Sequence, residues 1–185
     1  MTTTTALRLA ALVAAALSTS ACGLIGGGGS GDGPAPRGTS RTVSFVNAQG
    51  QPAGTATLTA VEGGIFISSQ LRNLPEGTHG FHVHQTGSCQ APSFESAGGH
   101  LNPTTREHGF LNPRGEHAGD LPNITIRSDG TAAADAVARG LVLGSGANGL
   151  LDDDGSALVV HAGVDDYRTE PSGNSGPRIA CAVVR

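Results

Sequence analysis

Five of the chain's seven histidines lie in one stretch, from Gly80 to Asp120, which also contains one of the three cysteines. The stretch opens with FHVH, where a strand's period of two puts both imidazoles on one face and both apolar side chains on the other. Glycine, proline and asparagine are frequent in the remainder, which predicts a long loop. A loop this long with so few apolar residues needs something other than a core to order it. Histidines joined by a carboxylate indicate a metal.

Short segments with alternating polarity predict a β fold for the rest of the chain. Besides the histidine-bearing strand, they are TVSFV, TATLTAV, IFISSQL, NITIR, TAAADAV, ALVVH and RIACAVV. Turn-forming residues separate them, and no segment has a sustained helical period. These roughly eight strands predict an all-β sandwich or barrel.

The N-terminal residues are expected to lie outside this fold. Residues 1–21 have the layout of a secretory signal peptide, with Arg8, an apolar run and then small residues. Cys22 follows directly and predicts lipoprotein processing, although an aliphatic residue is usual where Thr19 stands. The alternative is ordinary cleavage nearby, which leaves Cys22 as a free thiol or removes it. Residues 22–39 are then a flexible Gly-rich tether, and residues 40–185 form one domain.

These features predict an exported protein that a lipid anchor holds at the outer face of the cell membrane.

The formal net charge is −4, the chain has no lysine, and only 3% of its residues are aromatic. It therefore has neither a basic stripe nor a stacking platform, and nothing favours nucleic-acid binding.

Several short motifs agree with one known family in order and local spacing. They are HVH, GGHLNP, EHG, HAGD, LVVH and GNSGPRIAC. The chain from about Arg41 to Arg185 thus resembles copper,zinc superoxide dismutases of the exported bacterial type. The resemblance implies an eight-stranded antiparallel Greek-key barrel with long metal-binding and substrate-guiding loops. It also implies dismutation of superoxide to oxygen and hydrogen peroxide by a copper redox cycle with a zinc-supported bridging histidine.

The resemblance further implies a set of metal ligands. Copper would be bound by His82, His84, His100 and His161, and zinc by His100, His108, His117 and Asp120. His100 occurs in both sets as the bridging ring. Four nitrogen donors suit copper(II), and three nitrogens with one oxygen suit tetrahedral zinc.

Other positions take their roles from the same resemblance. Arg178 matches the active-site arginine that receives the anion, and Asp165 matches the aspartate that joins a copper-side to a zinc-side histidine. The neighbouring Asp166 is an alternative to Asp165. Cys89 and Cys181 match the family's disulfide. His79 matches a structural histidine and is not counted as a ligand.

The guiding loop, Val164 to Gly176, departs from the family because it has no lysine, so Arg168 is the candidate to attract superoxide. One alternative function is a dismutase-like copper-binding or copper-delivery module without turnover, but the complete ligand set and Arg178 argue against it. A second alternative is a surface protein stapled by zinc alone, which leaves His82, His84 and His161 unexplained. A homodimer is possible, and the sequence does not define the subunit contacts.

Overall fold

The computed structural model describes residues 1–2 and 33–185. The expected signal peptide and most of the expected tether, including Cys22, lie outside these residues. Among the described residues, no helix is long and apolar enough to cross a membrane.

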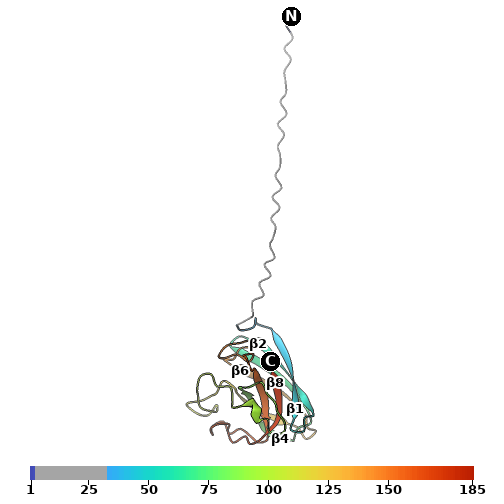
Figure 1. The fold of residues 1–185 in the computed structure, drawn as a ribbon, viewed down its shortest axis with the longest axis vertical. Coiled ribbons are helices and arrows are strands. Elements are labelled where there is room, and N and C mark those ends of the chain that lie inside the picture. The colour runs from blue at the N-terminus through green and yellow to red at the C-terminus, as the bar shows by residue number, and fades with distance from the viewer. Residues whose placement is uncertain (3–32) are drawn as a thin grey trace.

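Eight antiparallel strands form one sheet that nearly closes into a barrel, which confirms the predicted Greek-key fold (Figure 1). Their order in the sheet is β5-β4-β7-β8-β1-β2-β3-β6. The strands are β1 (Ser40–Asn47), β2 (Pro52–Val61), β3 (Gly64–Leu71), β4 (Gly77–His84), β5 (Asp120–Ile126), β6 (Ala132–Arg139), β7 (Ser156–His161) and β8 (Arg178–Val184). The end strands β5 and β6 lie beside each other without pairing.

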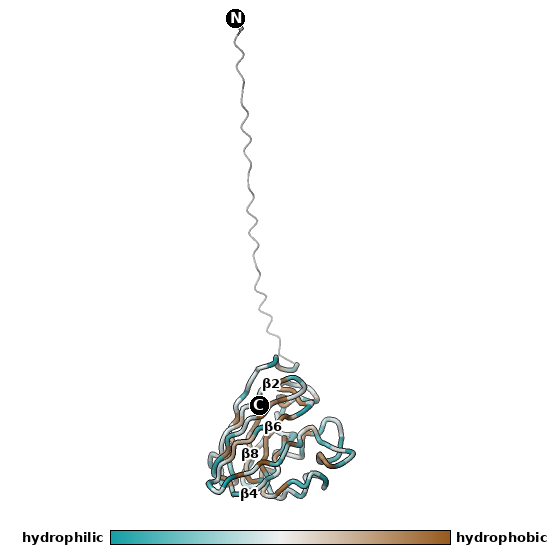
Figure 2. Tube along the Cα trace, turned by 180° about the vertical axis from the view of Figure 1, so that it is seen from behind, coloured by the Kyte–Doolittle hydropathy of each residue, from teal (hydrophilic) through white to brown (hydrophobic). Residues whose placement is uncertain are grey.

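The core is aliphatic with a few aromatic rings. Phe45, Leu58, Ile67 and Phe81 are fully buried inside the barrel. The hydropathy colouring in Figure 2 places apolar residues along the strands, whereas the loops are mainly hydrophilic. A core of this kind follows from the alternating segments, because every second side chain of each strand points inward.

The residues of β4 from His79 to His84 are all buried, as are all six residues of β7. Phe81 and Val83 belong to the barrel core, and His82 and His84 point to the other face. Long loops cover that outer face, including one 3-10 turn, Glu95–Ala97. The barrel wall therefore supports a second buried layer, which consists of polar side chains.

Residues 34–38, which the sequence analysis assigns to the tether, contact the barrel. Pro34 forms a bridge with Gly144, and the amide of Ala35 donates to the carbonyl of Leu143 at 3.1 Å. The amide of Gly38 donates to the carbonyl of Ala60 at 2.9 Å. The chain thus joins the folded body several residues before β1.

Candidate metal centre

The strand register brings the predicted site residues together. His82 in β4 pairs with Asp120 in β5, and His161 in β7 pairs with Arg178 in β8. A separate antiparallel bridge joins His84 to His100. Strand β4 also pairs with β7, where His82 lies opposite Val159, so backbone pairing alone brings together segments that are far apart in sequence.

Four buried histidines form a first cluster, which consists of His82, His84, His100 and His161. Their ligand nitrogens all lie within 4.8 Å of one another. Nε2 of His84 is 3.4 Å from Nε2 of His161, and the ring centroids of His82 and His100 are 4.0 Å apart. The ring of His82 also lies close to that of His161, with centroids 4.8 Å apart.

Two buried nitrogens of this first cluster, Nδ1 of His82 and Nε2 of His100, have no hydrogen-bond partner among the described residues. A buried polar atom without a partner is costly, so the structure needs a group that accepts these lone pairs. A cation among four imidazoles supplies one, and the donor set is that preferred by copper. The first cluster therefore fits a copper ion.

A second cluster contains His100, His108, His117 and Asp120, all of them buried. The carboxylate oxygen Oδ1 of Asp120 lies 2.8 Å from Nδ1 of His100, 3.0 Å from Nδ1 of His108 and 3.3 Å from Nδ1 of His117. The other oxygen accepts the amides of Gly109 at 2.8 Å and His117 at 3.1 Å. Three nitrogens around one oriented oxygen fit tetrahedral zinc.

His100 belongs to both clusters, with one ring nitrogen in each. Nδ1 faces Asp120 in the second cluster, and the unpartnered Nε2 faces the first cluster. No other residue is common to these two clusters. The geometry therefore places a single imidazole between two cation-binding positions.

Carbonyl groups set the tautomers of two rings in the first cluster. Nδ1 of His84 lies 2.9 Å from the carbonyl oxygen of Gly98, and Nδ1 of His161 lies 3.0 Å from that of Gly176. A carbonyl can only accept, so Nδ1 carries the hydrogen in both rings. The Nε2 lone pairs are then free to point into the cluster.

Asp165 lies between the two clusters. Its Oδ2 accepts from Nε2 of His82 at 2.8 Å, and its Oδ1 accepts from Nε2 of His108 at 2.9 Å. Asp165 is 1% exposed. The side chain of Asp166 is on the surface, where its Oδ1 accepts the backbone amides of Arg168 and Thr169. Of the two aspartates that the sequence offered, Asp165 therefore has the contacts of the bridging residue.

Burial keeps the first cluster neutral. It lowers the pKa of His82 to about 3 and that of His161 to about 4, and it moves the pKa of His84 and of His100 downward as well. The hydrogen bonds that these rings donate to Asp165 and to backbone carbonyls oppose this effect without overcoming it. Neutral rings keep the lone pairs that a metal requires.

In the second cluster, hydrogen bonds between histidines and carboxylates outweigh the effect of burial on the pKa values. Burial alone would raise the pKa of Asp120, but hydrogen bonds from His100, His108 and His117 hold it well below its usual value. For His108, burial lowers the pKa, and the hydrogen bonds to Asp120 and Asp165 outweigh this and raise it to about 9. The carboxylate of Asp120 is thus ionised at neutral pH and favours a cation beside it.

Arg178 lies at the edge of a small pocket that opens over the first cluster. The pocket has a volume of about 160 Å³, and its lining includes His84, Gly99, His100, His161, Pro171, Ser172, Gly176 and Arg178. The guanidinium of Arg178 donates to the carbonyls of Phe94 and Gly98, each at 2.6 Å. These bonds fix a permanent positive charge beside the exposed edge of the histidines.

The predicted disulfide between Cys89 and Cys181 is present, with Cα atoms 5.7 Å apart. Cys181 in β8 is buried against Phe94, Ala97 and Val159. The bond ties the start of the long loop to the strand that carries Arg178. It therefore fixes the loop whose carbonyls hold the guanidinium.

His79 and Arg168, the other two residues considered from the sequence, lie outside both clusters. His79 contacts two carbonyls, those of His161 at 2.8 Å and Pro75 at 3.1 Å, and neither cluster includes it. Arg168 is exposed, with Nη1 3.4 Å from the carbonyl of Leu111, and it does not line the pocket. Asn123 and Tyr167 hydrogen-bond to Asp165, and Glu170 accepts the backbone amide of His108. No motif marks these three, because their roles depend on the fold of two loops.

Comparisons with known proteins agree with this geometry. The family model described as copper/zinc superoxide dismutase matches residues 52–184. "Superoxide dismutase [Cu-Zn] 1" of Aquifex aeolicus is 43% identical over 145 residues, which cover 77% of this chain and 86% of the relative. "Superoxide dismutase-like protein YojM" of Bacillus subtilis is 44% identical over 146 residues, with 77% and 74% covered.

Two solved structures are also similar. A crystal structure of a SOD-like protein from Bacillus subtilis matches with a TM-score of 0.74 and 42% identity, covering 78% of this chain and 97% of that one. The copper/zinc superoxide dismutase from Brucella abortus matches with a TM-score of 0.63 and 31% identity, covering 80% and 100%. With the family model covering most of the chain and these relatives covered over most of their length, this chain belongs to the copper/zinc superoxide dismutase family.

Proposed function

We propose that this protein dismutates superoxide to oxygen and hydrogen peroxide, with copper and zinc as its cofactors. The observation that carries the proposal is the shared ring of His100, whose two nitrogens lie in two adjacent buried clusters. One cluster offers four nitrogens and the other offers three nitrogens and an oxygen. These are the donor sets of a redox-active and a structural metal, respectively.

The first cluster, His82, His84, His100 and His161, is the copper site. Copper supplies reversible one-electron transfer, which dismutation requires because one superoxide is oxidised and a second is reduced. The protein contributes neutral imidazoles in fixed orientations, set by Gly98 and Gly176 for two of the rings. The pocket beside Arg178 limits access to a small molecule.

The second cluster, His100, His108, His117 and Asp120, is the zinc site. Zinc has no redox chemistry and orders the long loop between β4 and β5. Asp165 connects the two sites by accepting from His82 and His108. The orientation of a ring at one site thereby depends on the other.

Two residues of the chain handle the substrate. Arg178 binds the superoxide anion, since its guanidinium is charged and lines the pocket. Reduction of superoxide to hydrogen peroxide needs two protons. Nε2 of His100 would take up one proton from solvent and pass it to the reduced oxygen, while Nδ1 keeps facing Asp120. The second proton comes from water. The pocket lining includes His100, so this delivery is direct.

The alternative is a dismutase-like module that binds or delivers copper without turnover. It needs a test because one relative, at 44% identity, carries a name that says only dismutase-like. Metal analysis of the purified domain, with a dismutation assay of the same preparation, separates the two. One copper and one zinc per chain with activity supports the enzyme. Bound copper without activity supports the module, and zinc alone without activity supports the stapled surface protein.

Export and lipid anchoring complete the proposal. Residues 1–21 are the signal peptide, Cys22 is the lipidated N-terminus, and residues 40–185 are the dismutase domain. Residues 22–39 connect the two, and residues 34–38 of this connection contact the barrel. Stable membrane retention needs more than one acyl chain, as a processed lipoprotein provides. A Cys22→Ser variant is expected to appear in the medium with unchanged activity per molecule. Wild-type protein that already fractionates as soluble would contradict the anchor.

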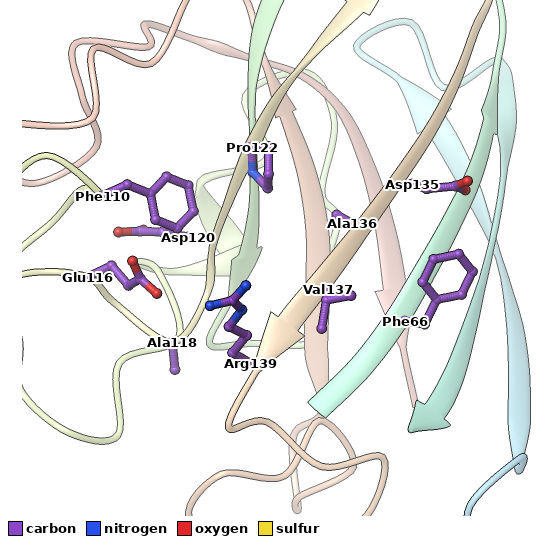
Figure 3. A pocket seen from close by; sticks show the side chains of 10 residues that line it. All are labelled: Phe66, Phe110, Glu116, Ala118, Asp120, Pro122, Asp135, Ala136, Val137 and Arg139. Atoms are coloured by element: carbon purple, nitrogen blue, oxygen red, sulfur yellow. The ribbon is translucent and has the colours of Figure 1, made fainter. Parts of the chain in front are cut away.

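We also propose a homodimer, with the contact placed over the pocket in Figure 3. Phe66 on β3 and Val137 on β6 are exposed there, with Phe110 at the other side of a pocket of about 500 Å³. Arg139 lines the same pocket, as does Glu116, and neither is in an ion pair within residues 33–185. A two-fold contact can bury the apolar side chains and pair the opposite charges across it. Sedimentation equilibrium of wild type and Val137→Glu tests this, and a monomeric wild type would contradict it.

A further inference from the structure

The polar groups of Asp165 are held by two residues that belong to neither metal cluster. The side-chain amide of Asn123 donates to the carbonyl of Asp165 at 2.9 Å, and its oxygen accepts the amide of Asp165 at 2.9 Å. The amide of Tyr167 donates to Oδ1 of Asp165 at 2.7 Å. With the bonds from His82 and His108, every polar group of Asp165 is engaged.

The hydroxyl of Tyr167 completes the connection to the barrel wall. It accepts the backbone amide of Asn123 at 2.7 Å. Strand β5 ends the strand order, and Asn123 has no partner in its ladder with β4. The hydroxyl therefore satisfies an edge amide that the sheet leaves unpaired, and it fixes the loop to the strand that begins with Asp120.

Tyr167 also contacts the metal-binding loop. Its carbonyl accepts the amide of Leu111 at 3.0 Å, and its ring lies 5.3 Å from that of Phe110. Gly109 allows this approach, because a Cβ there would overlap the carbonyl of Tyr167. Three elements, β5 and both long loops, thus meet at Tyr167 beside Asp165.

We propose that Asn123 and Tyr167 are positioning residues for dismutation, which hold the Asp165 carboxylate in the one place where it bonds His82 and His108 together. The proposal rests on the proposed copper and zinc sites. An outer carboxylate sets the orientation and basicity of a metal-binding imidazole, and its loss typically costs ten- to a hundredfold in metal affinity or activity. Neither Asn123 nor Tyr167 belongs to a metal cluster or lines the pocket beside Arg178. Their effect passes through Asp165.

The experiment uses full-length protein loaded with copper and zinc. Asn123→Ala removes both amide bonds, Tyr167→Phe removes one hydroxyl and keeps the ring, and Asn148→Ala is the matched control. Asn148 is exposed, and its amide donates to the carbonyl of Gly140 at 3.1 Å, outside both clusters. The readouts are the rates of copper and zinc loss to EDTA and the electron paramagnetic resonance spectrum of copper.

We expect Asn123→Ala to lose both metals about tenfold faster than wild type, with a changed copper spectrum. Tyr167→Phe should change both readouts in the same direction by less, and Asn148→Ala should match wild type. If Asn123→Ala fails to fold, Tyr167→Phe carries the test alone, since it deletes a single oxygen atom.

Repeating Asn123→Ala in an Asp165→Ala background separates positioning from a general loss of stability. Because Asn123 acts through Asp165, the second substitution should add nothing to the rate of metal loss. An equal effect in both backgrounds would overturn the proposal, as would variants that keep both metals as wild type does. A wild-type protein that binds neither metal would instead overturn the proposed function.

Discussion

His161 and Arg178 are paired residues of the β7–β8 ladder, so one backbone register sets both a ring of the first cluster and the guanidinium at the pocket. The ladder shifts by one position at this pair, between Val160 and His161. The ring of His161 faces the cluster, and Arg178 reaches the carbonyls of Phe94 and Gly98. One backbone register therefore positions both a ligand of the proposed copper site and the residue proposed to bind superoxide.

Replacement of Arg178 should slow the enzyme more than replacement of Arg168. The chain is net negative and its guiding loop has no lysine, so a local positive charge must attract superoxide. Arg178 lines the pocket and Arg168 does not. We expect Arg178→Ala to lower the second-order rate constant by about tenfold or more, and Arg168→Ala by much less. Arg178→Lys keeps the positive charge but loses the planar guanidinium, so its rate constant should lie between those of wild type and Arg178→Ala.

The same rate constant should fall as salt is added, because ions screen the attraction over about 8–10 Å. A salt series on wild type, Arg178→Ala and Arg168→Ala measures this directly. The dependence should be shallower in Arg178→Ala than in wild type. A wild-type rate that is flat or rises with salt would mean that steering does not operate here.

Gly173 should be intolerant of a side chain. It has a φ of +64°, and a Cβ at this position would overlap Oδ1 of Asp165. Gly140 is the matched control, with a φ of +73° and no atom within 4 Å of such a Cβ. Both alanine variants should lose about 1 kcal/mol or more of unfolding free energy from backbone strain. Only Gly173→Ala should also weaken metal retention, about tenfold in an EDTA challenge, and equal retention in the two variants would contradict this.

Loss of the disulfide should destabilise the domain. Cys89 and Cys181 are 92 residues apart, for which chain entropy alone gives about 4–5 kcal/mol. The double variant Cys89→Ser, Cys181→Ser is expected to lose stability of this order in a urea titration. It should also bind superoxide less well, since the loop that holds Arg178 is released. Free thiols in protein isolated from its native compartment would show that the bond does not form there.

The metal-free protein should be most stable near pH 6.5. Burial lowers the pKa of His82 to about 3 and of His161 to about 4, whereas an unfolded histidine titrates near 6.5. The unfolded chain binds more protons between these values, so stability falls as the pH drops from 6.5 toward 4. For His108 the pKa is raised to about 9, and its contribution is lost as the pH rises from 6.5 to 9. Urea midpoints measured from pH 4 to pH 9 test both changes. Midpoints that stay constant below pH 6.5 would contradict the contribution of His82 and His161.

Much of this structure could be predicted from the sequence because the determining signals are local. The alternation of FHVH gives β4 its two faces, and motifs such as HAGD place ligands at strand ends. The barrel topology required the family resemblance, since the strand pattern alone does not distinguish a barrel from a sandwich. The confirmed disulfide also came from the resemblance and not from spacing.

Other features could not be predicted because they depend on two loops meeting in space. Asp165 and Asp166 are adjacent and chemically identical, and only the fold buries one of them between His82 and His108. Tyr167 has a φ of +59°, a conformation that nothing in the surrounding sequence signals. The contact of Pro34 with Gly144 could not be predicted either, because a Gly- and Pro-rich segment has the composition of a flexible tether.

One ring, that of His100, is shared by the proposed copper and zinc sites, and the copper spectrum of His100→Ala tests this sharing most directly. The variant should show a changed copper site and weakened zinc retention at once, because Nε2 and Nδ1 belong to different clusters. His108→Ala is the comparison, since it should mainly weaken zinc and disorder the loop. An electron paramagnetic resonance spectrum of His100→Ala with an unchanged copper signal would contradict the shared ring.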